Sequence, residues 1–229
     1  MIEVVFMAGD GLDVFRIVFA LLSLASAIAY QGIERRPPSV LRTGLKTASI
    51  GFLVPLPLLA PGGAVPALPL ALLALAFLFS AFGDLFLALK GDTRNFARGL
   101  AAFLVSHLFY IAVMVPLASA PDTLAAKAVS LILGLGAIAL YFSLAPMLGR
   151  MKLSVGLYLV VILVMALAAL AIPAGAPWLG LGAVLFVISD SVIAVDKFRT
   201  SIPWRGLIVW TTYYAGQALM ALSLLALLG

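Results

Sequence analysis

Long apolar runs, separated by short breaks rich in charged residues, proline and glycine, follow one another along almost the whole chain. A helix that crosses a membrane needs about 20 predominantly apolar residues. The pattern therefore predicts an all-α integral membrane protein with eight transmembrane helices, which form a single polytopic domain over residues 1–229. The expected helices are 12–31, 45–60, 67–89, 98–118, 125–145, 153–172, 178–196 and 205–228.

The second of these segments differs from the others because it is short and carries Pro55 and Pro57. Proline lacks the backbone N–H group and its ring clashes with the preceding helical turn. We therefore expect the helix over 45–60 to be kinked or partly unwound.

Composition supports the same fold class. Hydrophobic residues make up 65% of the chain and charged residues 10%, whereas a soluble domain carries about 25% charged residues. The excess apolar surface must face lipid, which excludes a water-soluble fold. The net charge of +5 does not indicate nucleic acid, because the basic residues stand singly between apolar runs. Membrane lipid is the expected partner of these residues.

The basic residues also predict the orientation of the helices. Of 14 lysines and arginines, 12 fall in the breaks after the first, third, fifth and seventh helices, and only Arg16 and Lys127 lie on the opposite side. Cytoplasmic loops carry the excess of positive charge, so both termini should be non-cytoplasmic. The stretch before the first helix is acidic, unlike a secretory signal, and we expect that helix to be retained. The expected location is a bacterial inner (cytoplasmic) membrane.

A weak repeat relates the two halves of the chain. Arg98-Gly99-Leu100 opens the fourth helix and Arg205-Gly206-Leu207 opens the eighth. Each follows a helix with an aspartate near its cytoplasmic end. We interpret this as a hypothesis of two parallel four-helix repeats.

Asp84 and Asp190 are the acidic residues that fall inside apolar segments; the other seven acids lie in termini, loops or helix ends. An ionisable group in a membrane span is costly, and its default interpretation is functional. Asp84 stands six residues before Lys90 and Asp190 seven before Lys197. Both should therefore lie about 10 Å inside the cytoplasmic boundary. Interhelical hydrogen bonding and snorkelling are the structural alternatives.

Other unusual polar residues are expected at a similar depth in the cytoplasmic half of the membrane. They are Lys46, His107, Tyr110, Tyr213, Tyr214 and Gln217. We expect these residues to bind substrate. The alternatives are snorkelling for Lys46 and interhelical packing or hydrogen bonding for the others.

Several chemistries are excluded by residue type. With one histidine and no cysteine, one chain cannot build a His₃ or cysteine zinc site, and we expect no metal and no cofactor.

Of two carboxyl groups in a low dielectric, one ionises while the other stays protonated. An acid beside an anion suits the cleavage of acetal-like C–O bonds. A proton-coupled lipid or small-molecule transporter is the competing interpretation, and a non-catalytic lipid-binding protein is a further one.

Four short motifs carry a resemblance to a known family. They are Gly83-Asp84, the pattern Ser106-His107 followed by Tyr110, the stretch from Leu185 to Phe198, and Thr212 to Gln217. In this order and on these helices, the chain resembles the YhhN family of membrane proteins, whose characterised members are lysoplasmalogenases. The resemblance implies hydrolysis of the vinyl ether bond of 1-alkenyl lysophospholipids, giving a fatty aldehyde and a glycerophospho-base. It also implies that Asp84 and Asp190 are the catalytic residues.

Overall fold

The structure is a computed structural model, and it describes residues 2–60, 67–89, 93–121, 123–173 and 177–229. Every regular element in these described ranges is a helix. The short helices are α1 (Ile2–Phe6), α3 (Val40–Gly51) and α4 (Pro55–Leu58), with 3₁₀ turns η1 (Val115–Leu117) and η2 (Gly149–Met151). The long helices are α2 (Asp13–Ile33), α5 (Ala67–Ala88), α6 (Thr93–Met114), α7 (Leu124–Leu144), α8 (Lys152–Leu170), α9 (Pro177–Phe198) and α10 (Arg205–Leu228).

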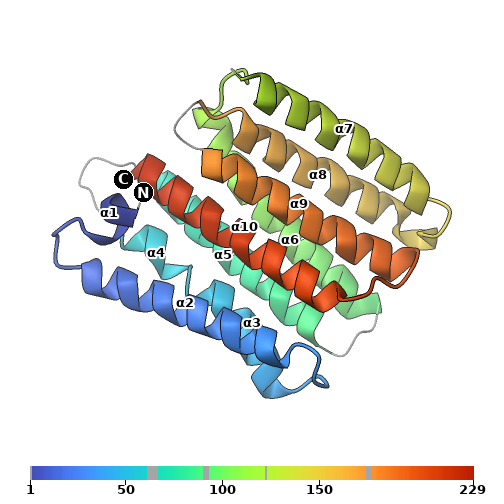
Figure 1. Cartoon of the computed structure of the whole chain (residues 1–229), viewed down its shortest axis with the longest axis horizontal. Helices are drawn as coiled ribbons and strands as arrows, with labels where there is room; N and C mark the ends of the chain where they lie inside the picture. Colours follow the sequence, from blue (N-terminus) through green and yellow to red (C-terminus); the bar gives the residue numbers. More distant parts are fainter. Residues whose placement is uncertain (1, 61–66, 90–92, 122, 174–176) are drawn as a thin grey trace. The chain divides into compact units, whose positions relative to one another are not determined.

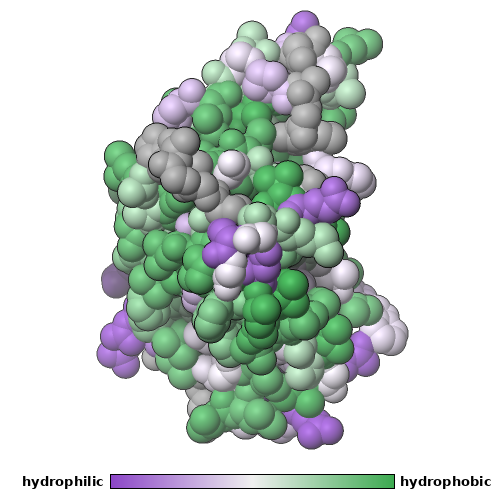
Figure 2. Space-filling view, turned by 90° about the vertical axis from the view of Figure 1, so that its left-hand side faces the viewer, coloured by the Kyte–Doolittle hydropathy of each residue, from purple (hydrophilic) through white to green (hydrophobic). Residues whose placement is uncertain are grey.

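The long helices identify the chain as an integral membrane protein. Seven helices within the described ranges are long and apolar enough to cross a membrane. Figure 2 shows hydrophobic residues over most of the visible surface, with hydrophilic residues in separate groups. In α7 none of the hydrophobic window is buried, and side chains such as Leu131, Ile132 and Phe142 are exposed. Such a helix is stable only where lipid covers these side chains.

The segment predicted over 45–60 is divided between two short helices and is not one continuous helix. Helix α3 begins at the cap residue Ser39, whose hydroxyl accepts from the backbone N–H of Arg42, and it ends at Gly51. A turn over 52–54 leads into α4, where Pro55 is the first helical residue. The interruption is the one expected from the prolines, since Pro55 and Pro57 bring no N–H donor to a continuous helix. The count of eight spans stays a prediction.

The chain divides into two compact units, residues 1–113 with 221–229, and residues 114–220. In the first unit, α3 packs against both α2 and α5, and α4 contacts the same two helices (Figure 1). Fully buried side chains such as Ile50, Leu73 and Phe77 form its core. In the second unit, α8 packs between α7 and α9 (Figure 1), and Ile162, Met165 and Phe186 are buried.

Candidate functional site

Helices α5 and α6 form an antiparallel pair joined by a buried polar contact. The Ser80 and Ser106 hydroxyl oxygens lie 2.7 Å apart, and Ser106 donates to the carbonyl oxygen of Ala76 at 2.8 Å. Ser106 has a single hydroxyl hydrogen, so Ser80 is the donor between the two. One turn away, the rings of Phe77 and Tyr110 meet edge to face at 5.9 Å. These contacts fix the register of the two helices.

Gly83 sets how closely α6 approaches the backbone beside Asp84. A Cβ atom added to Gly83 would lie 2.5 Å from the ring of Phe103. Only glycine leaves room for that ring, as expected at close helix contacts. In the resulting register Asp84 lies level with Ala102 on α6.

Asp84 forms an ion pair with Lys46, which α3 brings to the face of α5. The Lys46 Nζ atom lies 3.1 Å from Asp84 Oδ1, and the two side chains are 12% and 1% exposed. Charges removed from water to this degree are tolerated when they are paired. The ion pair therefore explains how a carboxylate is tolerated inside an apolar helix. It also brings Lys46, which was predicted to bind substrate, into contact with Asp84, which was predicted to be catalytic.

His107 and Tyr110 lie on the buried face of α6, and both are fully buried. The His107 Nδ1 atom lies 2.5 Å from the carbonyl oxygen of Phe103. A carbonyl can only accept, so Nδ1 is the donor. The register places His107 roughly 7–8 Å along the helix axis from the level of Asp84. Because side chains lean toward the N-terminus of their own helix, these two side chains lean toward each other.

Helices α9 and α10 form a second antiparallel pair. The backbones of Gly182 and Gly216 are in contact, and the Ser189 hydroxyl donates to the carbonyl oxygen of Val209 at 3.2 Å. Between these points, the rings of Phe186 and Tyr213 meet edge to face at 5.2 Å. This register places Asp190 level with the turn after Arg205.

Asp190 receives a hydrogen bond that the sequence analysis did not predict. The hydroxyl of Tyr158, on α8, donates to Asp190 Oδ2. Tyr158 is buried and is six residues past Lys152. The spacing argument that gave the depth of the aspartates would have placed Tyr158 at a similar depth. The sequence therefore contained the information needed to find this residue.

The aromatic residues of α10 form a cluster at its N-terminal half. Trp210 stacks on Tyr214, with ring centroids 6.1 Å apart, and contacts Tyr213 at 5.7 Å. The Gln217 amide donates to the Tyr213 hydroxyl at 3.3 Å. By the register, Gln217 lies roughly 13 Å along the axis from the level of Asp190. Tyr213 is therefore better placed than Gln217 to act with Asp190.

The predicted residues thus form two groups, one in each unit. The first unit holds Lys46, Asp84, His107 and Tyr110. The second holds Asp190, Tyr213, Tyr214 and Gln217, with the addition of Tyr158. A single cavity containing both groups stays a prediction. In the described part of the chain, no group of three His, Cys, Asp or Glu side chains could hold a metal ion.

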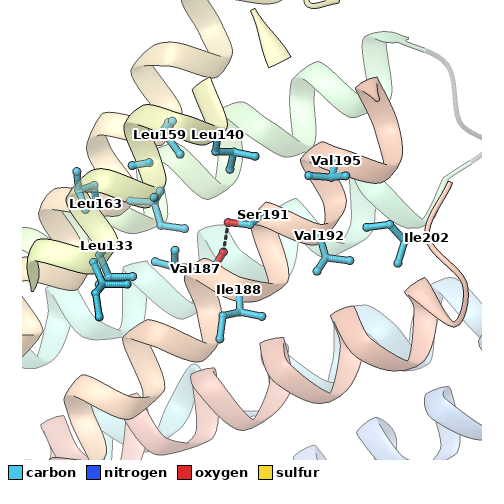
Figure 3. Close-up of a pocket in the computed structure, with 14 residues that line it drawn as sticks. Leu133, Leu140, Leu159, Leu163, Val187, Ile188, Ser191, Val192, Val195 and Ile202 are labelled. Atoms are coloured by element: carbon cyan, nitrogen blue, oxygen red, sulfur yellow. Dashed lines mark hydrogen bonds between the residues drawn. The ribbon is translucent and has the colours of Figure 1, made fainter. Parts of the chain in front are cut away.

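An apolar groove lies between α7, α8 and α9 (Figure 3) and encloses about 420 Å³. Leu133, Leu163 and Ile188 help to line it, and the Ser191 hydroxyl donates to the carbonyl oxygen of Val187 at 2.7 Å. At about 100° per residue, the lining face of α9 is roughly a third of a turn away from Asp190. Asp190 is accordingly not among the residues that line the groove.

Comparison with known proteins shows the family of the chain. The profile of the YhhN family matches residues 41–224. The chain belongs to the YhhN family. The match spans both units and includes Lys46, Asp84, Tyr158 and Asp190.

Curated relatives carry the name lysoplasmalogenase. The chain is 38% identical to lysoplasmalogenase TMEM86A of Homo sapiens, over 63% of this chain and 61% of that protein. It is 34% identical to TMEM86A of Bos taurus, over 63% and 61%. It is 32% identical to the lysoplasmalogenase of Mycobacterium bovis, over 63% and 57%. The chain thus spans about three fifths of the length of these relatives. No solved structure matches.

Proposed function

We propose that this protein is a membrane-embedded lysoplasmalogenase, which hydrolyses the vinyl ether bond of 1-alkenyl lysophospholipids by acid–base catalysis through Asp84 and Asp190. The observation that carries the proposal is that both aspartates lie inside membrane helices, each held by a polar side chain from a neighbouring helix. Family membership and the names of the relatives support the substrate class. The expected location is an inner membrane, with the site open to the cytoplasmic leaflet.

The reaction suits two carboxyl groups in different ionisation states. Protonation of the vinyl β-carbon converts the ether to an oxocarbenium ion. Water adds to the cationic carbon, and the hemiacetal collapses to a fatty aldehyde and the free hydroxyl of the glycerophospho-base. A carboxylic acid supplies the proton, and a carboxylate stabilises the cation and orients water. Each atom of the products comes from the lipid or from one water molecule.

The surrounding residues would hold the lipid. His107 and Tyr110 on α6, and Tyr213 and Tyr214 on α10, offer polar atoms beside apolar rings, which suits the boundary between a glycerol unit and its hydrocarbon chain. Gln217 would act through the Tyr213 hydroxyl, to which it donates. We assign these residues to substrate binding.

A pair of matched lipids tests the proposed function. The purified protein is incubated with 1-alkenyl and 1-acyl lysophospholipids that have the same headgroup and chain length, and aldehyde and fatty acid are measured. Aldehyde should form from the alkenyl lipid, without fatty acid from the acyl lipid. Fatty acid release without aldehyde would indicate an ester hydrolase, and proton flux in liposomes without either product would indicate a carrier.

Substitution of the aspartates separates catalysis from folding. Asp84→Asn and Asp190→Asn keep the size of the side chain and remove its acid–base function. Each should lower kcat on the order of 10²-fold or more. Asp196→Asn is the matched control, because Asp196 lies on α9 but pairs with Arg205 at 3.0 Å and accepts from the Ile202 N–H. This control should keep its activity, and wild-type turnover in either of the first two variants would contradict the proposal.

A further inference from the structure

The hairpin formed by α7 and α8 carries a second groove, which adjoins the one in Figure 3. This α7–α8 groove encloses about 390 Å³ and lies within the second unit. Ala137 and Leu163 line both grooves. Ile138, Leu157 and Val160 line the α7–α8 groove and are exposed on the outer surface. Because the outer surface of membrane helices faces lipid, a hydrocarbon chain is the group that would fill this groove.

The α7–α8 groove has about the length of one lipid leaflet. Along α8 its lining extends from Lys152 to Leu163, which is roughly 16 Å at the rise of an α-helix. Along α7 the lining extends from Phe142 back to Ala137. The hydrocarbon core of a bilayer is about 30 Å thick, so one leaflet contributes about half of it. The groove therefore extends from the turn of the hairpin to about the middle of the membrane.

Polar groups lie at the end of the groove that is nearest the turn. Lys152 lines the groove, and it is the exposed first residue of α8, directly after η2. Tyr141 also lines the groove and reaches across to α8, because a Cβ atom on Gly156 would lie 3.5 Å from the Tyr141 hydroxyl oxygen. An ammonium group and a phenol can both donate to a phosphate oxygen. The donors thus lie at the end of the groove where the phosphate of a membrane lipid belongs.

The charges of the hairpin favour an anionic headgroup over a zwitterionic one. No acidic residue stands between Asp122 and Asp190 in the sequence, whereas Arg150 and Lys152 both lie at the turn of the hairpin. The ammonium group of a zwitterionic headgroup would therefore meet like charges there and no carboxylate. Basic pockets between transmembrane helices are known to bind anionic lipid headgroups.

We propose that the α7–α8 groove binds an anionic phospholipid, whose phosphate contacts Lys152 and whose hydrocarbon chain lies along the groove. The lipid covers part of α7, a helix whose hydrophobic window is otherwise not buried, and so it holds α7 against α8. It is a bound lipid of the membrane and not a substrate. The proposal is independent of the vinyl ether reaction, because it involves none of the residues assigned to that reaction.

A comparison of two headgroups tests the role of Lys152. Diacyl phosphatidylglycerol and diacyl phosphatidylcholine with the same chains are added to the purified protein in detergent, and each Kd is measured by native mass spectrometry. The wild type should bind phosphatidylglycerol about fivefold more tightly, because one basic residue near the membrane surface contributes about 1 kcal/mol. Lys152→Gln should reduce this preference to less than about twofold, and Lys152→Arg should keep it, since arginine also presents a cation.

Lys127→Gln is the matched control for the charge. Lys127 is an exposed residue in the first turn of α7, at the other end of the hairpin, and it lines neither groove. This variant should keep the preference of the wild type. Equal binding of the two lipids by the wild type, or an unchanged preference in Lys152→Gln, would overturn the proposal. An equal loss in Lys127→Gln would overturn it as well, because net charge and not the groove would then set the preference.

Filling the groove tests the position of the hydrocarbon chain. Ala137→Phe places a large side chain between α7 and α8, whereas the control Leu135→Phe changes an exposed residue of α7 that lines neither groove. Ala137→Phe should weaken the binding of both lipids at least about tenfold, since each buried methylene group contributes about 0.8 kcal/mol. The ratio of the two Kd values should stay as in the wild type. Unchanged binding in Ala137→Phe, with the melting temperature of the wild type, would show that the chain lies elsewhere.

A competing lipid separates a bound membrane lipid from a substrate. A 1-acyl lysophosphatidylcholine of equal chain length is added to the complex of the wild type with phosphatidylglycerol. It should displace phosphatidylglycerol only at a concentration several times higher, whereas displacement at equal concentration would mean that the groove takes lysolipids and would overturn the proposal. None of these three lipids contains a vinyl ether, so the result does not depend on whether the protein releases aldehyde.

Discussion

Gly182 and Gly216 bring α9 and α10 into direct backbone contact. A Cβ atom on Gly182 would lie 2.8 Å from the carbonyl oxygen of Gly216, and a Cβ on Gly216 would lie 2.7 Å from the carbonyl oxygen of Gly182. Backbone atoms cannot move aside as a flexible side chain can. The two glycines therefore hold the register that brings Phe186 to Tyr213 and sets the level of Asp190.

The first prediction tests this contact. Gly216→Ala should lower thermal stability in detergent, because overpacking at a rigid contact costs about 1–3 kcal/mol, and activity should fall with it. Gly134→Ala on α7 is the control, since an added Cβ there meets no atom within 4 Å and alanine favours the helix. Equal melting temperatures for the two variants would show that the helices can separate at no cost.

The second prediction concerns pH and the N-terminal end of α2. Arg16 is fully buried and pairs with Asp10 and Asp13, while its Nε atom donates to the carbonyl oxygen of Leu59 at 2.5 Å. The hydrogen bond from Arg16 holds the pKa of Asp10 below its usual value. A carboxyl group whose pKa is lowered by folding adds stability above its unfolded pKa of about 3.9, and loses it as the pH falls through the folded value.

Wild-type protein should therefore melt at a higher temperature than Asp10→Asn near neutral pH. This difference should begin to shrink as the pH falls below about 4, and it should vanish below the lowered pKa of Asp10. Glu3→Gln, which removes an exposed carboxylate from α1, is the control and should follow the wild type at each pH. A wild-type advantage that is as large at pH 3 as at pH 7 would contradict the assigned role of Asp10.

Much of the fold could be predicted from hydropathy, because lipid-facing helices must be apolar throughout. The last helix begins and ends where predicted, at Arg205 and Leu228. The fourth was predicted from residue 98, but α6 begins at Thr93. Its first two turns carry Arg94 and the exposed Arg98, and an apolar pattern does not detect helical turns that lie among polar residues.

The site was only partly predictable for a related reason. Asp84 and Asp190 stand out because a carboxyl group inside an apolar run is rare. The residues that contact these aspartates are determined by tertiary packing, and the spacing of residues in the sequence does not reveal that packing. Lys46 was expected to bind substrate, and in the structure it forms an ion pair with Asp84. Tyr158 is 32 residues from its partner Asp190, and it lies on α8, whose other residues are mostly apolar.

The two antiparallel helix pairs have similar but not identical registers, which bears on the duplication hypothesis. Asp84 lies level with Ala102, four residues after Arg98, as the Gly83–Phe103 and Ser80–Ser106 contacts show. Asp190 lies level with Ile208, three residues after Arg205, as the Gly182–Gly216 and Ser189–Val209 contacts show. The two offsets differ by one residue, and the duplication stays a hypothesis.

The third prediction concerns topology and rests on the distribution of basic residues. A reporter that is active only in the cytoplasm should be active when fused after Met151 or Thr200, and inactive after Pro121 or Gly229, because positive loops stay inside. Expression of each fusion is checked with an antibody. Activity of the fusion at Gly229 would contradict the expected non-cytoplasmic C-terminus.

The last prediction tests the mechanism through the origin of two atoms. If a carboxylic acid protonates the vinyl β-carbon, that proton comes ultimately from solvent, so the aldehyde formed in heavy water should carry one deuterium on the carbon next to its carbonyl. The turnover rate should also fall in heavy water, because proton transfer to carbon limits it. Free aldehyde exchanges this hydrogen slowly. The product is therefore reduced at once and compared with authentic aldehyde treated in the same way.

Heavy-oxygen water provides the complementary measurement. Water adds to the alkenyl carbon, so the heavy isotope should enter the aldehyde oxygen before reduction, and the glycerol hydroxyl should keep the oxygen of the lipid. Attack at the glycerol carbon would reverse this distribution. Aldehyde without deuterium, or label in the glycerol oxygen, would show that hydrolysis does not begin with protonation of the vinyl ether, and neither aspartate could then be the acid assigned to it.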